Sequence, residues 1–289
     1  MKEAEEARLF KEHIMVNIFN YIHKDSPVHK LSGSSKLLLL LFWMLSAMTT
    51  FNTPFLLVLT ILSFILFRIS KIKLSEVRVM LLFTLVFLVL NNILIYLFSP
   101  ELGVGIYGTR HLIVHIAGRY TITCEQLLYH LNVLLKYTST IPLVLLFVAT
   151  THPSEFASSL NKIGVSYKIS YGVSLALRYI PGLVDDYRTI SLSQQARGIE
   201  MSRKESLIKR FKAAANIIIP LILSSFDKIE IIANAMELRG FGKNKKRSWY
   251  MGHDFETGDF IVIAFGILLV VISIAYTIIN GSRFWNPFI

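Results

Sequence analysis

Cysteine and charge are both scarce in this sequence. Its 289 residues include one cysteine, Cys124, which excludes an intramolecular disulfide framework and a zinc site built from cysteines. Only 17% of the residues are charged, whereas soluble domains usually contain about 25%. Apolar residues make up 53% of the chain, and its mean hydropathy is +0.54. This composition excludes a typical soluble enzyme and a disordered chain, and it indicates a membrane protein.

Five apolar runs predict helices that cross a membrane, although the first two are short for a bilayer. They cover residues 37–51, 55–67, 80–98, 133–150 and 260–279. Between the first two runs, Asn52-Thr53-Pro54 predicts a turn because proline cannot continue the preceding helix. A sixth stretch, residues 169–183, contains Arg178 and Pro181 and is not counted. The sequence therefore predicts an all-α, polytopic membrane protein with about five transmembrane helices.

Lysine and arginine are distributed unevenly around these predicted helices. Of the 30 such residues, 26 lie in residues 1–36, 68–78 and 152–259. Cytoplasmic segments of membrane proteins are enriched in lysine and arginine. We therefore expect the N-terminus in the cytoplasm and the C-terminus outside. No secretory signal peptide is expected, because a polar segment precedes the first apolar run.

The predicted spans divide the chain into five parts. These are a cytoplasmic N-terminal segment (1–35), transmembrane helices 1–4 with an outer loop at about 99–130 (36–150), a cytoplasmic helical region (151–258), the last transmembrane helix (259–280) and an outer C-terminal tail (281–289). Glycines and the sequence Tyr120-Thr121-Ile122-Thr123 predict a short strand within the outer loop.

The basic segment 151–258 has the periodicity of amphipathic helices, and about three are expected. Residues 202–205 (SRKE) fit a capping box at a helix start, and Pro220 is expected to break or kink that helix. Beyond it, apolar residues three or four apart predict another amphipathic helix. That face comprises Ile218, Ile222, Phe226, Ile229, Ala233 and Met236.

Two helix ends in this segment look alike. One reads Ala196-Arg197-Gly198, and the other, 42 residues later, reads Glu237-Leu238-Arg239-Gly240. A glycine after the last turn and an arginine within it also suit an ordinary helix end. Their repetition suggests a second use, in which a guanidinium held on a rigid helix end docks into an acidic groove of a partner.

Further motifs accompany these two helix ends. They are DSPVHKL at 25–31, ITCEQL at 122–127, TTHPSE at 150–155, LRYIP at 177–181, QARG at 195–198 and AMELRGFG at 235–242. Together they resemble the transmembrane coupling (T) component of energy-coupling factor (ECF) transporters, the family that includes the CbiQ-like subunits of cobalt importers. The resemblance extends from about Tyr21 to Trp249 and includes the last span. Leu238 and Lys136 depart from the residues common at those positions, alanine and arginine.

The resemblance implies a non-catalytic scaffold in an ATP-driven importer of a vitamin or metal ion. Two ABC-type ATPase subunits would bind the crossing cytoplasmic coupling helices, and a membrane-embedded substrate-binding (S) component would lie against the transmembrane part. By position, Arg197 and Arg239 would contact the ATPases, and Ala196, Gly198, Glu237 and Gly240 would shape the helix ends. No cofactor or metal is implied.

The chain lacks the G-x-x-x-x-G-K-[ST] loop that holds ATP phosphates, so ATP hydrolysis is expected from partners. A self-sufficient secondary carrier is one alternative, although no convincing inverted repeat is found. An intramembrane enzyme is the other, and it would need paired catalytic groups where the predicted spans have no carboxylates.

Several polar groups leave narrower alternatives open. His111 and His115 would suit a metal if they shared a helical face, but a plain loop is favoured. Asn91 and Asn92 suggest either a solute path or hydrogen bonds between helices.

Charged groups in the cytoplasmic segment leave two further pairs of alternatives open. Asp185 and Asp186 suggest a magnesium site or ion pairs with Arg178 and Arg188. A cluster of basic residues favours anionic lipid over nucleic acid, which would need interleaved aromatic residues. It comprises Arg203, Lys204, Lys209, Arg210 and Lys212.

Overall fold

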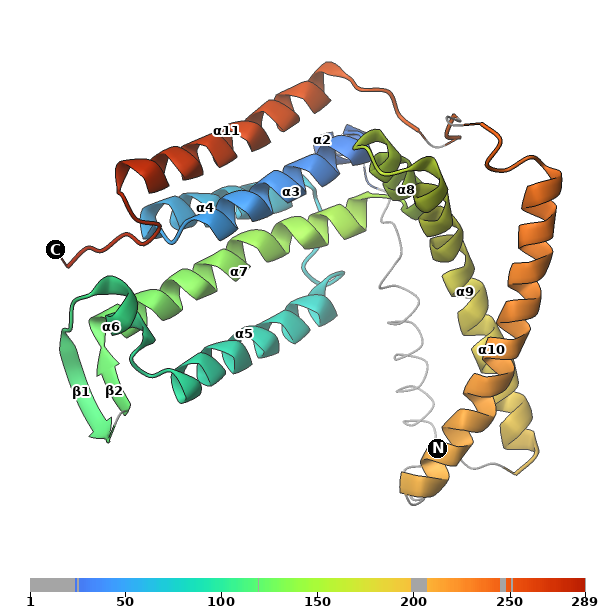
Figure 1. The fold of residues 1–289 in the computed structure, drawn as a ribbon, viewed down its shortest axis with the longest axis horizontal. Helices are drawn as coiled ribbons and strands as arrows, with labels where there is room; N and C mark the ends of the chain where they lie inside the picture. The colour runs from blue at the N-terminus through green and yellow to red at the C-terminus, as the bar shows by residue number, and fades with distance from the viewer. Residues whose placement is uncertain are drawn as a thin grey trace. The chain divides into compact units, whose positions relative to one another are not determined.

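A computed structural model describes residues 24, 26–118, 120–198, 207–244, 248–250 and 252–288. Its regular structure is almost entirely helical (Figure 1). The elements are α2 (Pro27–Lys30), α3 (Gly33–Thr49), α4 (Thr53–Ile69), α5 (Arg78–Phe98), α6 (Leu102–Tyr107), β1 (Leu112–Ala117), β2 (Tyr120–Thr123), α7 (Cys124–Thr150), α8 (Pro153–Lys162), α9 (Tyr167–Ala196), α10 (Leu207–Leu238) and α11 (Thr257–Ile279). They form two compact units: α8, α9 and α10 make up one, which we call the helical arm, and the other elements make up the membrane unit.

Each of the five predicted spans is a helix of the membrane unit. Helices α5, α7 and α11 are long and apolar enough to cross a membrane, and α3 and α4 are shorter apolar helices. The turn expected between α3 and α4 is confirmed: the Asn52 side chain accepts a hydrogen bond from the Phe55 N–H, and Pro54 lies in the first turn of α4. The chain is thus an all-α, polytopic membrane protein.

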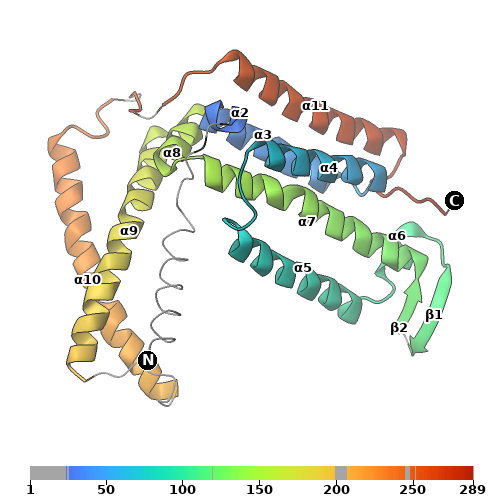
Figure 2. The same ribbon diagram turned by 180° about the vertical axis from the view of Figure 1, so that it is seen from behind.

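Helix α3 packs against both α11 and α7, and α4 packs against α7. In Figures 1 and 2 these helices lie side by side, with α5 beyond α7. Trp43, Leu56 and Leu59 are fully buried in the shared core. By contrast, α5 buries only Leu88 and exposes 76% of Phe83. A helix this apolar and this exposed is suited to lipid.

Polar contacts fix both ends of the α3–α11 pair. At one end the buried Asp259 carboxylate accepts hydrogen bonds from the Ser32 N–H and the Ser35 hydroxyl. At the other end the Thr49 and Ser273 hydroxyls bond to each other. A buried carboxylate is stable only when such donors replace the water it has lost.

A short helix and a β-hairpin connect α5 to α7. Strands β1 and β2 are antiparallel, which confirms the predicted strand at 120–123. Helix α7 begins at Cys124, well before the predicted start at 133, because the Thr123 side chain caps it and its polar first turn is buried. Apolar patterning alone could not reveal a buried turn that contains Glu125 and Gln126.

The structure shows how the two histidines are arranged, and it gives Asn92, but not the Asn91 side-chain oxygen, a hydrogen-bond partner. His111 precedes β1 and His115 lies within it, so the shared helical face is wrong, and the described residues contain no cluster suited to a metal ion. His111 instead contacts Glu125, whose carboxylate accepts its main-chain N–H. Asn92 bonds to the ring of His130 on α7 at 2.9 Å, which is the predicted bond between helices.

Both long helices of the arm continue through a proline. Helix α9 joins the 169–183 stretch to the Arg197 end, so the interpretation of 169–183 as a separate span is not supported. Helix α10 passes through Pro220, so of the break or kink expected there the break is wrong, and the bent course of the helix agrees with a kink (Figure 1). A proline removes one backbone hydrogen bond, which bends a helix without ending it when packing on both sides holds it. The predicted capping box at 202–205 lies outside the described residues.

Candidate functional site

Helices α9 and α10 cross each other in opposite directions, as both ribbon views show (Figures 1 and 2). Lys228 of α10 forms an ion pair with Asp186 of α9. Asp185 lies 3.8 Å from Arg188. These contacts support the ion-pair interpretation of the two aspartates over a magnesium site.

An aromatic cluster closes one end of this pair. Phe241, just beyond α10, lies 4.9 Å from Tyr171 and 5.6 Å from Tyr167 between ring centroids. Trp249 lies 5.8 Å from Tyr167, and its indole N–H donates to Asn161 at 3.1 Å. The end of α10 is therefore held against the start of α9, and aromatic pairs of this kind add about 0.5–1.5 kcal/mol each beyond their burial.

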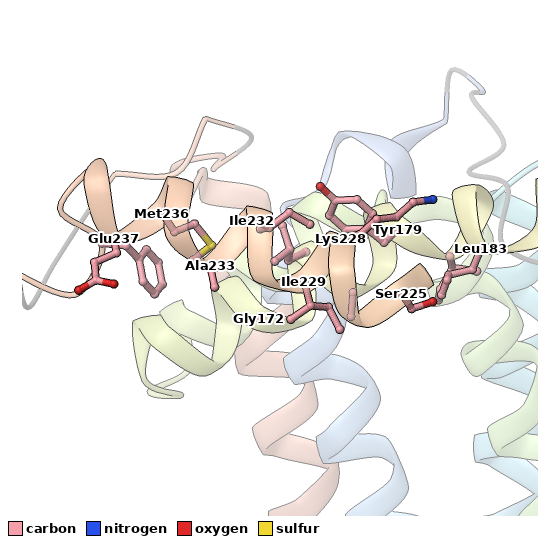
Figure 3. Close-up of a pocket in the computed structure, with 14 residues that line it drawn as sticks. Gly172, Tyr179, Leu183, Ser225, Lys228, Ile229, Ile232, Ala233, Met236 and Glu237 are labelled. Carbon is pink, nitrogen blue, oxygen red and sulfur yellow. The ribbon is translucent and has the colours of Figure 1, made fainter. Parts of the chain in front are cut away.

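An apolar groove of about 590 Å³ runs along the crossing. Figure 3 shows it between the two helices, with Glu237 near one end and Leu183 near the other. Gly172 and Ala176 on α9 face Ile229, Ala233 and Met236 on α10 across it. The predicted apolar face of α10 is thus only partly covered by α9, and Phe226 and Ile229 remain largely exposed.

The Arg239 end of α10 is a Schellman motif. The Gly240 N–H donates to the Glu237 carbonyl at 2.8 Å, and the Phe241 N–H donates to the Met236 carbonyl at 2.9 Å. Gly240 has a φ of +70°, a conformation that side chains disfavour. Because Phe241 also belongs to the aromatic cluster, the motif fixes Arg239 at a rigid end.

The Arg197 end of α9 repeats this chemistry. Arg197 is the C-cap, and the next residue, Gly198, has a φ of +83° and donates its N–H to the Gln195 carbonyl at 3.0 Å. The helix ends predicted at Ala196 and Leu238 are both confirmed. Two arginines therefore stand at structurally equivalent positions.

The structure does not bring the two arginines together. Since α9 and α10 are antiparallel, Arg239 lies near the start of α9 and Arg197 at its far end, about 40 Å from Tyr171 at the helical rise per residue. Both side chains are exposed, as are Ala196, Gly198 and Glu237, and Gly240 is half-buried. Leu238, beside Arg239, is 90% exposed. The arm thus presents two separate surfaces, each with one arginine.

Replacing Gly240 by alanine tests the capping geometry. A residue with a Cβ in the left-handed region costs about 1–2 kcal/mol, so Gly240→Ala should lower the free energy of unfolding by that order. Gly182→Ala is the control, because Gly182 is helical and a Cβ there meets no atom within 4 Å. Thermal unfolding of both variants in detergent measures the difference; equal midpoints would contradict the prediction.

Sequence reasoning did not identify the aromatic cluster or the Lys228–Asp186 pair. Tyr167 and Tyr171 are four residues apart and so lie on one face of a helix, but their partners Phe241 and Trp249 are distant in sequence. Asp186 was instead paired with arginines of its own helix. Only the antiparallel crossing reveals these partners.

The fold and these two helix ends define a class of protein, a multi-pass, all-α membrane protein with an attached arm of crossed helices. Comparison with family models gives the match "Cobalt transport protein" (CbiQ) over residues 24–249. The chain belongs to this family.

Relatives of known name extend the match over most of the chain. The Energy-coupling factor transporter transmembrane protein EcfT of Bacillus selenitireducens is 29% identical, over 91% of this chain and 98% of its own length. The protein of the same name from Streptococcus thermophilus is 30% identical, over 87% of this chain and 96% of its own length. The one from Lactococcus lactis subsp. cremoris is 26% identical, over 89% of this chain and 96% of its own length. The resemblance inferred from the motifs is therefore confirmed: the chain is a T component of the ECF transporter family, a transmembrane subunit of a transporter.

Proposed function

We propose that this chain is the scaffold that couples ATP hydrolysis by two partner ATPases to movement of a membrane-embedded S component. It contributes no catalytic group of its own. Each arginine end of the arm seats in an acidic groove of one ATPase, and closure of the ATPases moves the arm. The cargo is a vitamin or a metal ion, which the S component selects.

One observation carries this proposal: the arm presents two equivalent arginine ends that are exposed, rigidly capped and about 40 Å apart along α9. That separation suits two binding sites on two subunits and not one composite site. Guanidinium groups on rigid ends lose little entropy when they bind carboxylates bidentately.

Charge distribution supports a cytoplasmic location for the arm and the N-terminal segment, with the C-terminus outside. These segments, together with the α4–α5 connection, hold 26 of the 30 lysines and arginines. In this proposed orientation the arginine ends lie on the side where ATP is available. The exposed apolar residues of the membrane unit, those of α5 above all, offer the S component a surface within the membrane.

Affinity purification from native membranes, followed by transport assays, tests the proposal. The tagged chain should retain ABC-type ATPase subunits and a small membrane protein, identified by mass spectrometry. Proteoliposomes holding this complex should take up radiolabelled Co²⁺ or a labelled vitamin only with ATP. Uptake by the purified chain alone, driven by an ion gradient, would contradict the scaffold role and favour a secondary carrier.

A further inference from the structure

A cationic pocket lies where α3 and α11 end, beside the start of the C-terminal tail. Its volume is about 430 Å³. The residues that line it are Met48 and Thr49 of α3, Ile274, Thr277 and Ile278 of α11, and Arg283 beyond α11. None of them belongs to the arm or to the arginine ends, so the role of this pocket is a separate question.

Two basic groups converge on the end of α3 beside this pocket. Arg283 donates to the Met48 carbonyl at 3.2 Å, and Lys136 of α7 approaches the same carbonyl at 3.5 Å. The Lys136 ammonium lies 3.3 Å from the centroid of the Phe51 ring, and the Arg283 guanidinium carbon lies 5.4 Å from it. In the part of the chain that the structure describes, neither forms an ion pair.

The partial charges of nearby helix ends offset part of the positive charge of these side chains, but not all of it. The C-termini of α3 and α11 each contribute about half a negative charge, and the N-terminus of α4 contributes about half a positive one. Burial disfavours the charged form of Lys136, which is 7% exposed, so Arg283 and a partly charged Lys136 leave an excess of about one positive charge at most. A phosphodiester anion carries one negative charge and accepts bidentate hydrogen bonds from arginine.

Arg283 has donors available for such an anion. A guanidinium has five N–H groups, and one of them bonds to Met48. Among the described residues the others have no protein partner, and the side chain is exposed. The main chain at Arg283 is anchored, because its carbonyl accepts the Phe51 N–H at 2.7 Å.

The rest of the pocket is apolar. The Thr49 hydroxyl donates to the Ser46 carbonyl and the Thr277 hydroxyl to the Ser273 carbonyl, so neither is a free donor. Met48, Ile274 and Ile278 are 50%, 44% and 72% exposed on helices that face lipid. A free phosphate would find one arginine and no second donor on this surface, whereas a lipid would also bury its acyl chain there.

We propose that this pocket binds one anionic phospholipid, with its phosphodiester on Arg283 and its acyl chain along Ile274 and Ile278. Lys136, beneath the Phe51 ring, strengthens the positive potential at the headgroup. Basic pockets between transmembrane helices are a recognised form of lipid site on the cytoplasmic side of membranes, and this pocket offers the same chemistry at the C-terminal end of α11. The proposal does not depend on the coupling role of the arm.

Native mass spectrometry of the delipidated, full-length protein tests this site. The probes are dioleoyl-phosphatidylglycerol, dioleoyl-phosphatidylcholine and inorganic phosphate. The wild-type protein should bind phosphatidylglycerol about tenfold more tightly than phosphatidylcholine, because both lipids carry the phosphodiester but the basic groups repel the choline ammonium of phosphatidylcholine. Arg283→Gln should lose that preference. Arg110→Gln is the matched control, because Arg110 is also exposed but is paired with Glu101 at 2.8 Å.

A second variant keeps the test decisive if Arg283→Gln fails to fold. Ile274→Trp should fill the apolar part of the pocket and weaken binding of both lipids while leaving Arg283 in place. The proposal is overturned if folded Arg283→Gln or Ile274→Trp binds phosphatidylglycerol like the wild type. Displacement of phosphatidylglycerol by millimolar inorganic phosphate would also overturn it, since the site would then hold a free anion.

Discussion

The double variant Arg197→Glu/Arg239→Glu should lose both ATPases and all ATP-dependent uptake while still inserting in the membrane. Each substitution replaces a docking cation with an anion at an exposed helix end. Truncating one partner of a buried, hydrogen-bonded charge pair costs about 2–5 kcal/mol, and reversal adds repulsion. A loss of that size lowers affinity at least about thirtyfold at each end. Co-purification of the ATPases, quantified by mass spectrometry, measures the effect.

Single variants sharpen this prediction. Because the two ends are about 40 Å apart along α9, their effects on binding should add, and each single reversal should weaken one ATPase contact. Arg197→Lys should fall between wild type and Arg197→Glu, since lysine keeps the charge but not the bidentate geometry.

Arg178→Glu is the matched control for charge. Arg178 is also exposed but lies within α9, between the two arginine ends. This variant should retain both ATPases. Normal retention of both ATPases by the double variant, with its folding confirmed by thermal unfolding, would contradict docking by the arginines.

Gly103→Ala should be the most destabilising single substitution considered for the membrane unit. A Cβ at Gly103 would lie 2.5 Å from the Glu125 carbonyl oxygen and 2.6 Å from the Gln126 nitrogen. Both are backbone atoms of the first turn of α7, so no side-chain rotation relieves the clash. Helix α6 would have to move away from α7.

That movement would also disrupt a chain of hydrogen bonds. The Gly103 N–H donates to the Gln126 side chain at 2.7 Å, Gln126 bonds to the ring of His130, and His130 bonds to Asn92 of α5. Overpacking costs about 1–3 kcal/mol, and each buried polar group left unsatisfied costs a further 1–3 kcal/mol. We expect a loss of more than about 3 kcal/mol in the free energy of unfolding.

The matched control is two residues away on the same short helix. A Cβ at Gly105 meets no atom within 4 Å, so Gly105→Ala should be neutral or slightly stabilising through helix propensity. Unfolding of both variants in the same detergent, followed by circular dichroism, compares them. If Gly103→Ala unfolds at the wild-type midpoint, the close packing of α6 on α7 is contradicted.

Apolar patterning was sufficient to locate most of the membrane helices. The runs behind α5 and α11 are long and free of charge at their centres, so the predicted ends differ from the observed ones by only a few residues. At α7 the prediction failed because Glu125 and Gln126 are polar yet buried, each satisfied by partners that are distant in sequence.

The two arginine ends of the site could be predicted from local sequence, but the way in which their helices cross could not. Gly198 and Gly240 are local signals, since a positive φ after the last helical turn depends on one residue, and the sequence was sufficient to place both helix ends. The direction in which α9 and α10 cross depends on Phe241, Trp249 and Lys228 meeting α9, and no local pattern encodes those contacts. The sequence therefore predicted two arginine ends without predicting how far apart they lie.

The aromatic cluster makes those two ends mechanically unequal. Because Phe241 contacts Tyr167 and Tyr171, a force on the Arg239 end reaches the first turns of α9 directly, through these two ring contacts. A push on the Arg197 tip must first travel about 40 Å along α9. The two arginine ends thus lie at different distances from the start of α9. Under the proposed coupling, equal displacements of the two ends would rotate the start of α9 by different angles, even when the two partner subunits are identical.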